Sequence, residues 1–382
     1  MRRRLATLVV LLGALVAASP AAAFPPAPAV DASAALVATG GGEILYAYNP
    51  NRRLPMASIT KLMTALVVLQ HNKPSRVVTV RPAAAATGES TVNLKTGERL
   101  TVHDLLAAAL IQSANDAAVA LAAGTSNGNI PAFVARMNAR ARAMGLSNTH
   151  FANPDGLDAP GHYSSARDIL ALARAAMTKP IVRGLVRMRT AHIAGGRSLF
   201  TWNDLLSTYP GVFGVKTGHT DDAGWCEVAV ARRNGSAVYA VVLGSATRAG
   251  RNAALARLLT WGLDHYARIP VIQAGTPYAT ASVPFEDGVR LPLVATNPVG
   301  ALVRVDEPVV ERVVAPRSVK APVARGDRLG EVRVLQRGKV VAEAPLVAGR
   351  DVAAPSFAHR VAWYAGRALD EAGDMLGSIL PG

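Results

Sequence analysis

Apolar side chains recur at helical spacing within residues 55–70. Ile59, Leu62 and Leu66 fall three or four positions apart, as they do along the buried face of an amphipathic helix. The pattern therefore predicts a buried helix that begins near Ser58. Because serine is a favoured residue at a helix start, one interpretation of Ser58 is that it only caps this helix.

Strand and helix patterns alternate along the next part of the chain. Short apolar runs on both sides of residues 40–42 predict two strands joined by a turn. Asn234 and Gly235 separate two apolar runs and form a favoured two-residue turn, so residues 224–243 predict a β-hairpin. Helical spacing predicts further helices at residues 102–110, up to residue 123, at 130–144 and at 169–177.

The composition changes near residue 268. Short Val-rich runs then alternate with Gly, Pro and Asp turns, which predicts a small all-β domain over residues 268–354. In residues 355–382, apolar side chains such as Phe357, Val361 and Tyr364 fall on one face of a predicted amphipathic helix. This helix either packs on its own β domain or lies at a membrane interface as an anchor.

The first 23 residues indicate export. A basic start (residues 2–4) precedes an apolar run (residues 5–17) and an A-x-A cleavage site (residues 21–23). The apolar run is short for a membrane span of about 20 residues. We therefore predict a signal peptide at residues 1–23, and a mature protein in the periplasm or on the extracytoplasmic face of the cell membrane.

Length and charge narrow the function classes. The 382 residues suffice for one large domain and a smaller one, which we place at residues 24–267 and 268–354. The net charge of +15 is spread along the chain without a nucleic-acid motif, so we expect no nucleic-acid partner. A dispersed positive field suits anionic membranes or cell-wall polymers. Cys226 is the only cysteine and reads as a buried residue on a strand.

A lysine lies one helical turn after Ser58. The i, i+3 spacing of Ser58 and Lys61 places both side chains on one helical face. Burying a lysine on an apolar face is costly, and burial lowers its pKa because it disfavours the charged form. A neutral Lys61 could take the hydroxyl proton of Ser58, which is a weak nucleophile without a base.

Two other polar groups interrupt apolar patterns. Ser113 and Asn115 separate two predicted helices, where a turn with an N-cap is the alternative interpretation. Lys216, Thr217 and Gly218 follow an apolar strand and could bind an anionic group, with glycine allowing close approach to the backbone. The alternative there is a solvated strand end. Each motif alone is weak.

The three motifs occur in a known order. S-x-x-K at 58–61, S-x-N at 113–115 and K-T-G at 216–218 are the set of penicillin-binding proteins and related β-lactamases. With the stretches ASITKLMTA, IQSANDAA and GVKTGHTDDAGW, the chain resembles the low-molecular-mass penicillin-binding proteins that are serine-type D-alanyl-D-alanine carboxypeptidases. The resemblance covers residues 34–266 and continues less specifically toward the C-terminus.

The resemblance implies catalytic roles for three side chains. Ser58 would attack the carbonyl between the two terminal D-alanines of a peptidoglycan stem peptide, with Lys61 as its general base. Ser113 would pass a proton to the departing D-alanine. Asn115 would hydrogen-bond the substrate backbone and help to hold Lys61.

Substrate-binding roles follow from the same resemblance. Lys216 and Thr217 would hold the terminal carboxylate of the substrate, and Arg248 would add to its recognition. Gly218 lies beside them in the motif. The backbone N–H groups of His219 and of the nucleophile would form the oxyanion hole.

The implied fold is α+β, an antiparallel sheet flanked by helices as in β-lactamases and transpeptidases, followed by the small all-β domain and the amphipathic helix. Its partners would be peptidoglycan stem peptides, β-lactam antibiotics as covalent inhibitors, and a membrane contacted peripherally through the helix. Two alternatives remain: a β-lactamase, and a catalytically silent peptidoglycan- or penicillin-binding module. A Glu that helps to activate water in class A β-lactamases has no equivalent at residues 153–156.

Other polar residues form no recognised site. His150 and His162, with Asp155 and Asp158, lack a known metal-ligand spacing, so we expect neither a metal nor a cofactor. A second Lys-Thr-Gly at residues 95–97 has a loop-like context, and we interpret it as a turn.

Overall fold

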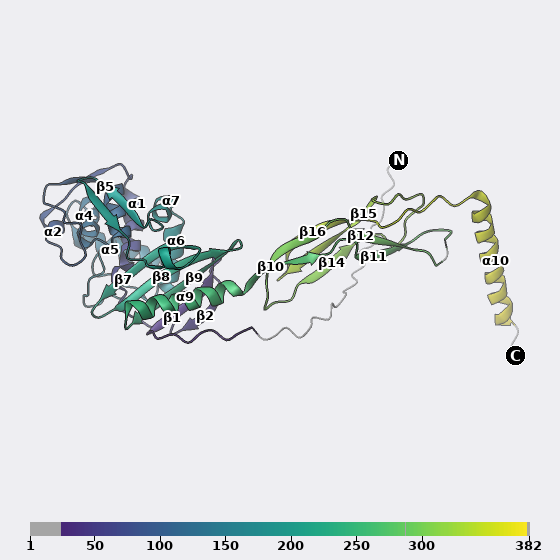
Figure 1. Ribbon diagram of the computed structural model, residues 1–382, viewed down its shortest axis with the longest axis horizontal. Helices are drawn as coiled ribbons and strands as arrows, with labels where there is room; N and C mark the ends of the chain where they lie inside the picture. The colour runs from purple at the N-terminus through teal and green to yellow at the C-terminus, as the bar shows by residue number, and fades with distance from the viewer. Residues whose placement is uncertain (1–23, 287, 380–382) are drawn as a thin grey trace. The chain divides into compact units, whose positions relative to one another are not determined.

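A computed structural model describes residues 24–286 and 288–379 (Figure 1). The chain divides into two compact units, of which one is Pro25–His265 and the other includes the residues from Tyr266 onward. The predicted signal peptide, residues 1–23, lies outside the described residues.

The larger unit is built on a five-stranded antiparallel sheet with the order β2-β1-β9-β8-β7. The predicted hairpin is confirmed, because Asn234 and Gly235 join β8 to β9 with positive φ values of 52° and 91°, as a two-residue type I′ turn requires. The strands are β1 (Ala34–Thr39), β2 (Ile44–Tyr48), β7 (Val212–Thr220), β8 (Gly224–Arg233) and β9 (Ser236–Ser245).

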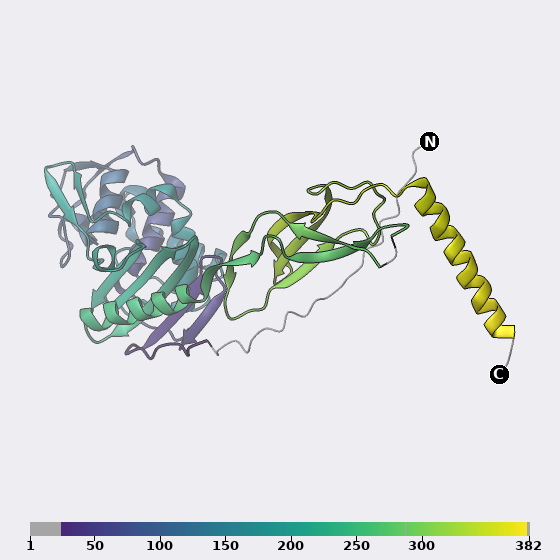
Figure 2. The ribbon, with the colours of Figure 1, turned by 45° about the vertical axis from the view of Figure 1, so that its right-hand side comes forward.

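Helices cover both faces of this sheet (Figures 1 and 2). Side chains alternate along the strands, so Leu36 and Val228 join one apolar core while Val37 and Ala229 join a second core with α9 (Arg248–Asp264). The first core contains α1 (Lys61–His71), α3 (Val102–Ile111), α4 (Asn115–Thr125), α5 (Ile130–Ala143) and α6 (Ala166–Met177).

Local sequence explains where these helices begin. Ser165 caps α6, and its hydroxyl accepts a hydrogen bond from the Asp168 backbone N–H at 3.2 Å. Thr101 caps α3 in the same way, through the N–H of Asp104. Shorter elements complete the unit: η1 (Ala57–Thr60), α2 (Pro82–Ala85), α7 (Pro180–Leu185), α8 (Leu205–Thr208), and the strand pairs β3 (Val77–Thr79) with β4 (Arg99–Thr101) and β5 (Thr190–Ile193) with β6 (Arg197–Phe200).

The second unit contains the predicted all-β domain. Its five-stranded sheet has the order β11-β12-β16-β15-β14, and β10 pairs with β13. Apolar side chains such as Leu291, Val332 and Leu346 form its own buried core. The strands are β10 (Tyr266–Ile272), β11 (Pro277–Ser282), β12 (Arg290–Ala295), β13 (Val299–Arg304), β14 (Val310–Val314), β15 (Arg328–Gln336) and β16 (Lys339–Ala348).

The predicted C-terminal helix is α10 (Phe357–Ile379). Phe357, Val361 and Tyr364, which the sequence placed on one apolar face, are exposed by 76%, 51% and 61%. Near its start, the helix contacts the loop at Phe285, whose ring lies 5.6 Å from that of Tyr364. Much of the apolar surface in this part of α10 is therefore uncovered. Of the described residues, no helix is long and apolar enough to cross a membrane.

Candidate active site

Ser58 lies in η1, a 3-10 helix of one turn, and not at the start of an α-helix. The α-helix itself begins at Lys61, and the residue before it, Thr60, makes no capping hydrogen bond through its side chain. Ala57, directly before Ser58, has a φ of 49°, a conformation that is strained for a residue other than glycine. The interpretation of Ser58 as a simple N-cap is therefore wrong. The turn instead places its hydroxyl at a pocket.

Lys61 is buried beneath Ser58 with three polar contacts. Its Nζ lies 2.7 Å from Ser58 Oγ, 2.6 Å from Asn115 Oδ1 and 2.6 Å from the carbonyl oxygen of Asp155. An ammonium has three donors and no acceptor, whereas a neutral amine has two donors and one lone pair. The two carbonyl oxygens can only accept, so a charged Lys61 donates to all three oxygens, whereas a neutral Lys61 donates to the two carbonyls and accepts a hydrogen bond from the hydroxyl of Ser58.

Burial favours this neutral form. Only 1% of Lys61 is exposed, and burial lowers its pKa to about 8, while the charges of Asp155, Glu89 and Asp116 act in the opposite direction. At pH 7 about a tenth of the molecules thus hold an uncharged amine beside the serine hydroxyl, which is several hundredfold more than at the ordinary lysine pKa of about 10.4.

The S-x-N motif lies in the turn between α3 and α4. Ser113 has a φ of 66°, and Asn115 is the first residue of α4, whose N-cap is Ala114. Asn115 Nδ2 donates to the carbonyl of Gly88 at 3.2 Å, which orients its Oδ1 toward Lys61. Neither Ser113 nor Asn115 acts as the N-cap, so the capping interpretation does not account for this pair.

Lys216 brings the third motif to the same place. It is 2% exposed on β7, and its Nζ donates to Ser113 Oγ at 2.9 Å and to the carbonyl of Thr217 at 2.8 Å. Burial, with the nearby charge of Lys61, lowers the pKa of Lys216 well below its ordinary value. The three sequence motifs thus form one connected group. The second Lys-Thr-Gly, at residues 95–97, lies in a turn.

Two glycines allow neighbouring backbone segments to lie close to the backbone of Ser58. A Cβ at Gly156, where φ is 94°, would overlap the carbonyl of Ala57. A Cβ at Gly218 would lie 3.0 Å from the backbone N of Ser58. Gly218 therefore allows β7 to approach the turn that carries Ser58, and Gly156 allows the loop that follows α5 to approach this turn from another side.

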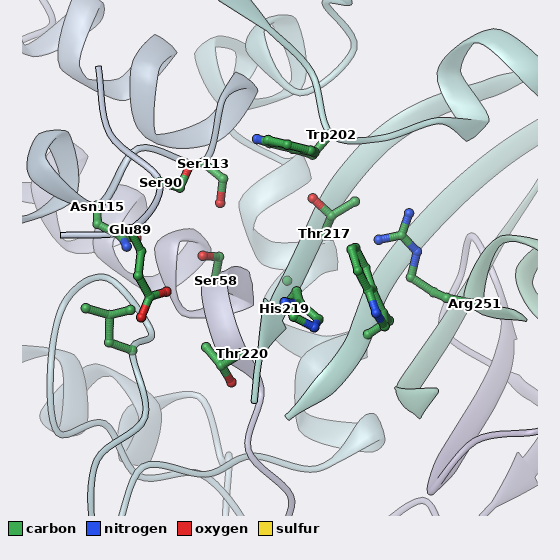
Figure 3. A pocket seen from close by; sticks show the side chains of 13 residues that line it. Ser58, Glu89, Ser90, Ser113, Asn115, Trp202, Thr217, His219, Thr220 and Arg251 are labelled. Atoms are coloured by element: carbon green, nitrogen blue, oxygen red, sulfur yellow. The ribbon is translucent and has the colours of Figure 1, made fainter. Parts of the chain in front are cut away.

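A pocket of about 210 Å³ opens above these groups (Figure 3). Figure 3 shows Ser58, Ser113 and Thr217 around its centre. Of the residues predicted for the site, the pocket is lined by Ser58, Ser113, Asn115, Thr217, Gly218 and His219. Lys61 and Lys216 are buried and reach it through Ser58 and Ser113.

Sequence reasoning missed part of the pocket wall. Trp202, Trp225, Glu89 and Arg251 line it without having been predicted. Arg248, for which a carboxylate-binding role is expected, is not among the residues that line this pocket; its Nε donates to Asp204 at 2.8 Å and its guanidinium lies over Trp202.

Arg251 follows Arg248 one helical turn later on α9, and Arg251 is the one that lines the pocket. Two arginines at i, i+3 share a helix face, so the sequence carried no signal that distinguishes them.

The histidines considered as metal ligands have other partners. His162 Nδ1 accepts from the N–H of Ala152 at 3.0 Å, so the proton is on Nε2, which lies 2.7 Å from Thr60 Oγ1 and donates to it. Burial lowers the pKa of His162 to about 4, which keeps the ring neutral. His150 Nδ1 lies 2.7 Å from the carbonyl of Gly161. Within the described ranges, no group of three or more His, Cys, Asp or Glu side chains could hold a metal ion.

Residues 21–247 match the D-alanyl-D-alanine carboxypeptidase family, peptidase S11. The chain belongs to this family. Residues 266–354 match the C-terminal domain of penicillin-binding protein 5. The family and the α+β fold predicted from the sequence are confirmed, and with them the D-alanyl-D-alanine carboxypeptidase function, a serine-type hydrolase activity.

Individual relatives cover most of the chain. D-alanyl-D-alanine carboxypeptidase DacF of Bacillus subtilis is 33% identical over 337 residues, 85% of this chain and 86% of the relative. The crystal structure of penicillin-binding protein 5 from Haemophilus influenzae has a TM-score of 0.62 at 30% identity and covers 86% of this chain and 99% of that one. Penicillin-binding protein D2 of Listeria monocytogenes, solved in an ampicillin-bound form, has a TM-score of 0.57 at 32% identity and covers 62% and 99%.

The close approach at Gly156 predicts a site-specific effect. Gly156→Ala should lower the rate of acylation by benzylpenicillin by about tenfold or more, because the new Cβ displaces the turn that carries Ser58. Gly161→Ala is the matched control, since Gly161 also has a positive φ but its Cβ would meet nothing closer than 3.7 Å. Equal loss of acylation in both variants, measured by stopped-flow fluorescence, would show that backbone strain and not the contact is responsible.

Proposed function

We propose that Ser58 is the acylated nucleophile of this carboxypeptidase and that Lys61 is its general base. The observation that carries the proposal is the 2.7 Å contact between Lys61 Nζ and Ser58 Oγ, with both N–H groups of a neutral lysine used by Asn115 and Asp155. The lone pair is then directed at the serine hydroxyl. A base with a pKa near the working pH transfers protons efficiently in both directions.

The reaction begins at the peptide bond between two terminal D-alanines. Ser58 Oγ forms a bond to the carbonyl carbon while its proton passes to Lys61. The intermediate then breaks its C–N bond, and the proton held by Lys61 is passed to the departing D-alanine amine through Ser113, which hydrogen-bonds Lys216 at 2.9 Å. Lys61 is then neutral again. Water attacks the ester carbonyl and gives one proton to Lys61, which returns it to Ser58 Oγ as the ester C–O bond breaks and the shortened stem peptide is released.

Backbone N–H groups would stabilise the developing oxyanion. We assign this role to Ser58, in the turn before α1, and to His219, on β7. Gly218 lets these two backbone segments lie close together, as the 3.0 Å distance from its Cβ position to Ser58 N indicates. Each such donor contributes about 3–4 kcal/mol to transition-state stabilisation.

The terminal carboxylate of the substrate would bind at the β7 side of the pocket. Thr217 presents its side chain there, with Lys216 buried behind it. Arg251 also lines this part of the pocket, so we assign it the role that the sequence suggested for Arg248. A bound carboxylate favours the charged form of Lys216, which burial alone disfavours. Asn115 would bind the substrate backbone from the opposite wall.

Ser58→Ala tests the nucleophile. We expect wild-type protein mixed with benzylpenicillin to carry one covalent adduct that lasts minutes or longer, and to release D-alanine from a stem peptide. Ser58→Ala should show neither, because Ala has no hydroxyl to acylate. Intact-mass spectrometry and a D-alanine assay measure the two outcomes. The matched control is Ser207→Ala, an exposed serine on α8.

Other outcomes would favour other functions. Rapid loss of penicillin without a lasting adduct would indicate a β-lactamase. Neither adduct nor turnover in the wild type would indicate a silent binding module.

The domain boundaries, residues 24–267, 268–354 and 355–382, are part of the proposal, as is export through the signal peptide at residues 1–23. We further propose that α10 contacts the membrane peripherally from the extracytoplasmic side. The exposed apolar side chains of Phe357, Val361 and Tyr364 support an interfacial helix, which binds through buried apolar area without spanning the bilayer.

Removing residues after Ala354 should move the protein from the membrane fraction to the soluble fraction, since the exposed apolar surface of α10 is then lost. Val361→Glu with Tyr364→Glu should have the same direction of effect in the full-length protein. Val310→Glu is the control, because Val310 is a similarly exposed apolar residue (60%) in the β domain. An unchanged distribution of the shortened protein, measured by fractionation and vesicle sedimentation, would contradict membrane binding by α10.

A further inference from the structure

A buried ion pair lies directly behind the carboxylate side of the pocket. Glu227 of β8 is 0% exposed and Arg251 of α9 is 1% exposed, and 3.0 Å separates Glu227 Oε2 from Arg251 Nε. A second carboxylate, Asp204, lies 3.6 Å from Arg251 Nη2 and also binds Arg248. The mechanism above makes no use of Glu227.

The register of the sheet places Glu227 beside the K-T-G strand. Glu227 is directly opposite Thr217 in the antiparallel pairing of β7 with β8. Directly opposed residues point to the same face of a sheet, with Cβ atoms about 5 Å apart. Thr217 and Arg251 both line the pocket, and Figure 3 shows the Arg251 guanidinium on the Thr217 side. Arg251 thus contacts the Glu227 carboxyl and also lines the side of the pocket where a substrate carboxylate would bind.

The carboxyl group of Glu227 has fewer hydrogen bonds than buried carboxyl groups usually have. Within the part of the chain that the structure describes, neither of its carboxyl oxygens has a hydrogen-bond partner, although Arg251 is within ion-pair distance. A buried carboxylate that is not fully hydrogen-bonded is costly in its charged form. Such a group is easily protonated.

We propose that Glu227 is a positioning residue that sets how much of the positive charge of Arg251 is available to the terminal carboxylate of the substrate. The inference rests on the carboxylate-binding role proposed above for this side of the pocket. When Glu227 is ionised, its charge offsets that of Arg251. When Glu227 is protonated, Arg251 attracts the substrate carboxylate more strongly. Substrate binding and protonation of Glu227 therefore favour each other, as linkage requires.

The pH range follows from the surroundings of Glu227. Burial raises its pKa to about 7, and the charge of Asp204 adds to the rise, while Arg251, Lys216 and Arg248 oppose it. Because protonation strengthens carboxylate binding, selectivity for a carboxylate-bearing substrate should be highest below pH 7 and should fall as the pH rises through 7. Lys216 faces the same site, and its own deprotonation would add a fall that does not depend on Glu227.

Two substrates with the same acyl group isolate this effect. An acylated D-Ala-D-Ala peptide and its C-terminal amide form the same acyl-enzyme, so any effect of Lys61 on serine activation enters both values of kcat/KM. The ratio of kcat/KM for the acid to that for the amide then reports the carboxylate interaction alone. In the wild type we expect this ratio to fall roughly fivefold to tenfold between pH 6 and pH 8.

Variants assign the titration to Glu227. Glu227→Gln keeps the shape and removes the charge, so its ratio should stay at the low-pH wild-type value up to pH 8, apart from any fall due to Lys216. Glu227→Asp keeps a carboxyl group and should restore the fall. Thermal unfolding of each variant shows whether it is folded.

Several results would overturn the inference. A wild-type ratio that does not change between pH 6 and pH 8 would do so without any variant, even if Glu227→Gln does not fold. A folded Glu227→Gln whose acid-to-amide ratio of kcat/KM falls with pH as in the wild type would also overturn the inference. So would a folded Glu227→Gln whose ratio at pH 6 is severalfold lower than that of the wild type. Failure of the proposed function itself has a different signature, namely a wild type that cleaves neither peptide.

Discussion

The structure depends on burying one lysine amine without leaving it unpaired. Lys61 comes from the start of α1, and it contacts Asn115 at the start of α4 and the Asp155 carbonyl in the loop after α5. Burying a polar group is tolerated only when its hydrogen bonds are satisfied. These segments must therefore fold together for the amine to be accommodated, and the same contacts leave the lone pair of the neutral amine for Ser58.

A second buried lysine lies beside Lys61, and burial together with the charge of Lys61 lowers its pKa. Lys216 reaches the same site from β7, and its proximity to Lys61 disfavours having both amines charged at once. Opposite charges are kept behind the pocket wall, where Glu227 and Asp204 approach Arg251. Without substrate, the lysine amines of the pocket are thus partly uncharged and the charge of Arg251 is partly offset by carboxylates. An anionic substrate favours the charged forms of these basic groups when it binds.

The sequence predicted the features that depend on local pattern. Helical spacing located α3, α5 and α6 to within a few residues, and Asn234-Gly235 located the β8–β9 hairpin because its turn geometry is local. The motif order also identified the polar residues that the structure brings together around Lys61. The roles assigned to those residues are proposals that rest on the geometry.

Other features could not be predicted, because they arise from tertiary packing. Ser58 reads as a helix cap, yet packing of β7 and Gly156 against its backbone holds it in a 3-10 turn. Arg248 and Arg251 are equivalent in the helix pattern, yet of the two only Arg251 lines the pocket, which depends on how α9 packs on the sheet. The burial of Glu227 likewise follows from the position of α9 on the sheet.

The most direct test of this account is the titration of Lys61 itself. In protein labelled with 13C at the lysine ε-carbons, the Lys61 resonance can be assigned by its absence in Lys61→Arg. The account predicts a midpoint near pH 8, so that the neutral base increases, and acylation with it, as the pH rises through that value. A midpoint at the ordinary lysine value of about 10.4 would mean that the amine is charged at neutral pH. Lys61 could not then accept the proton of Ser58, and the central claim would be contradicted.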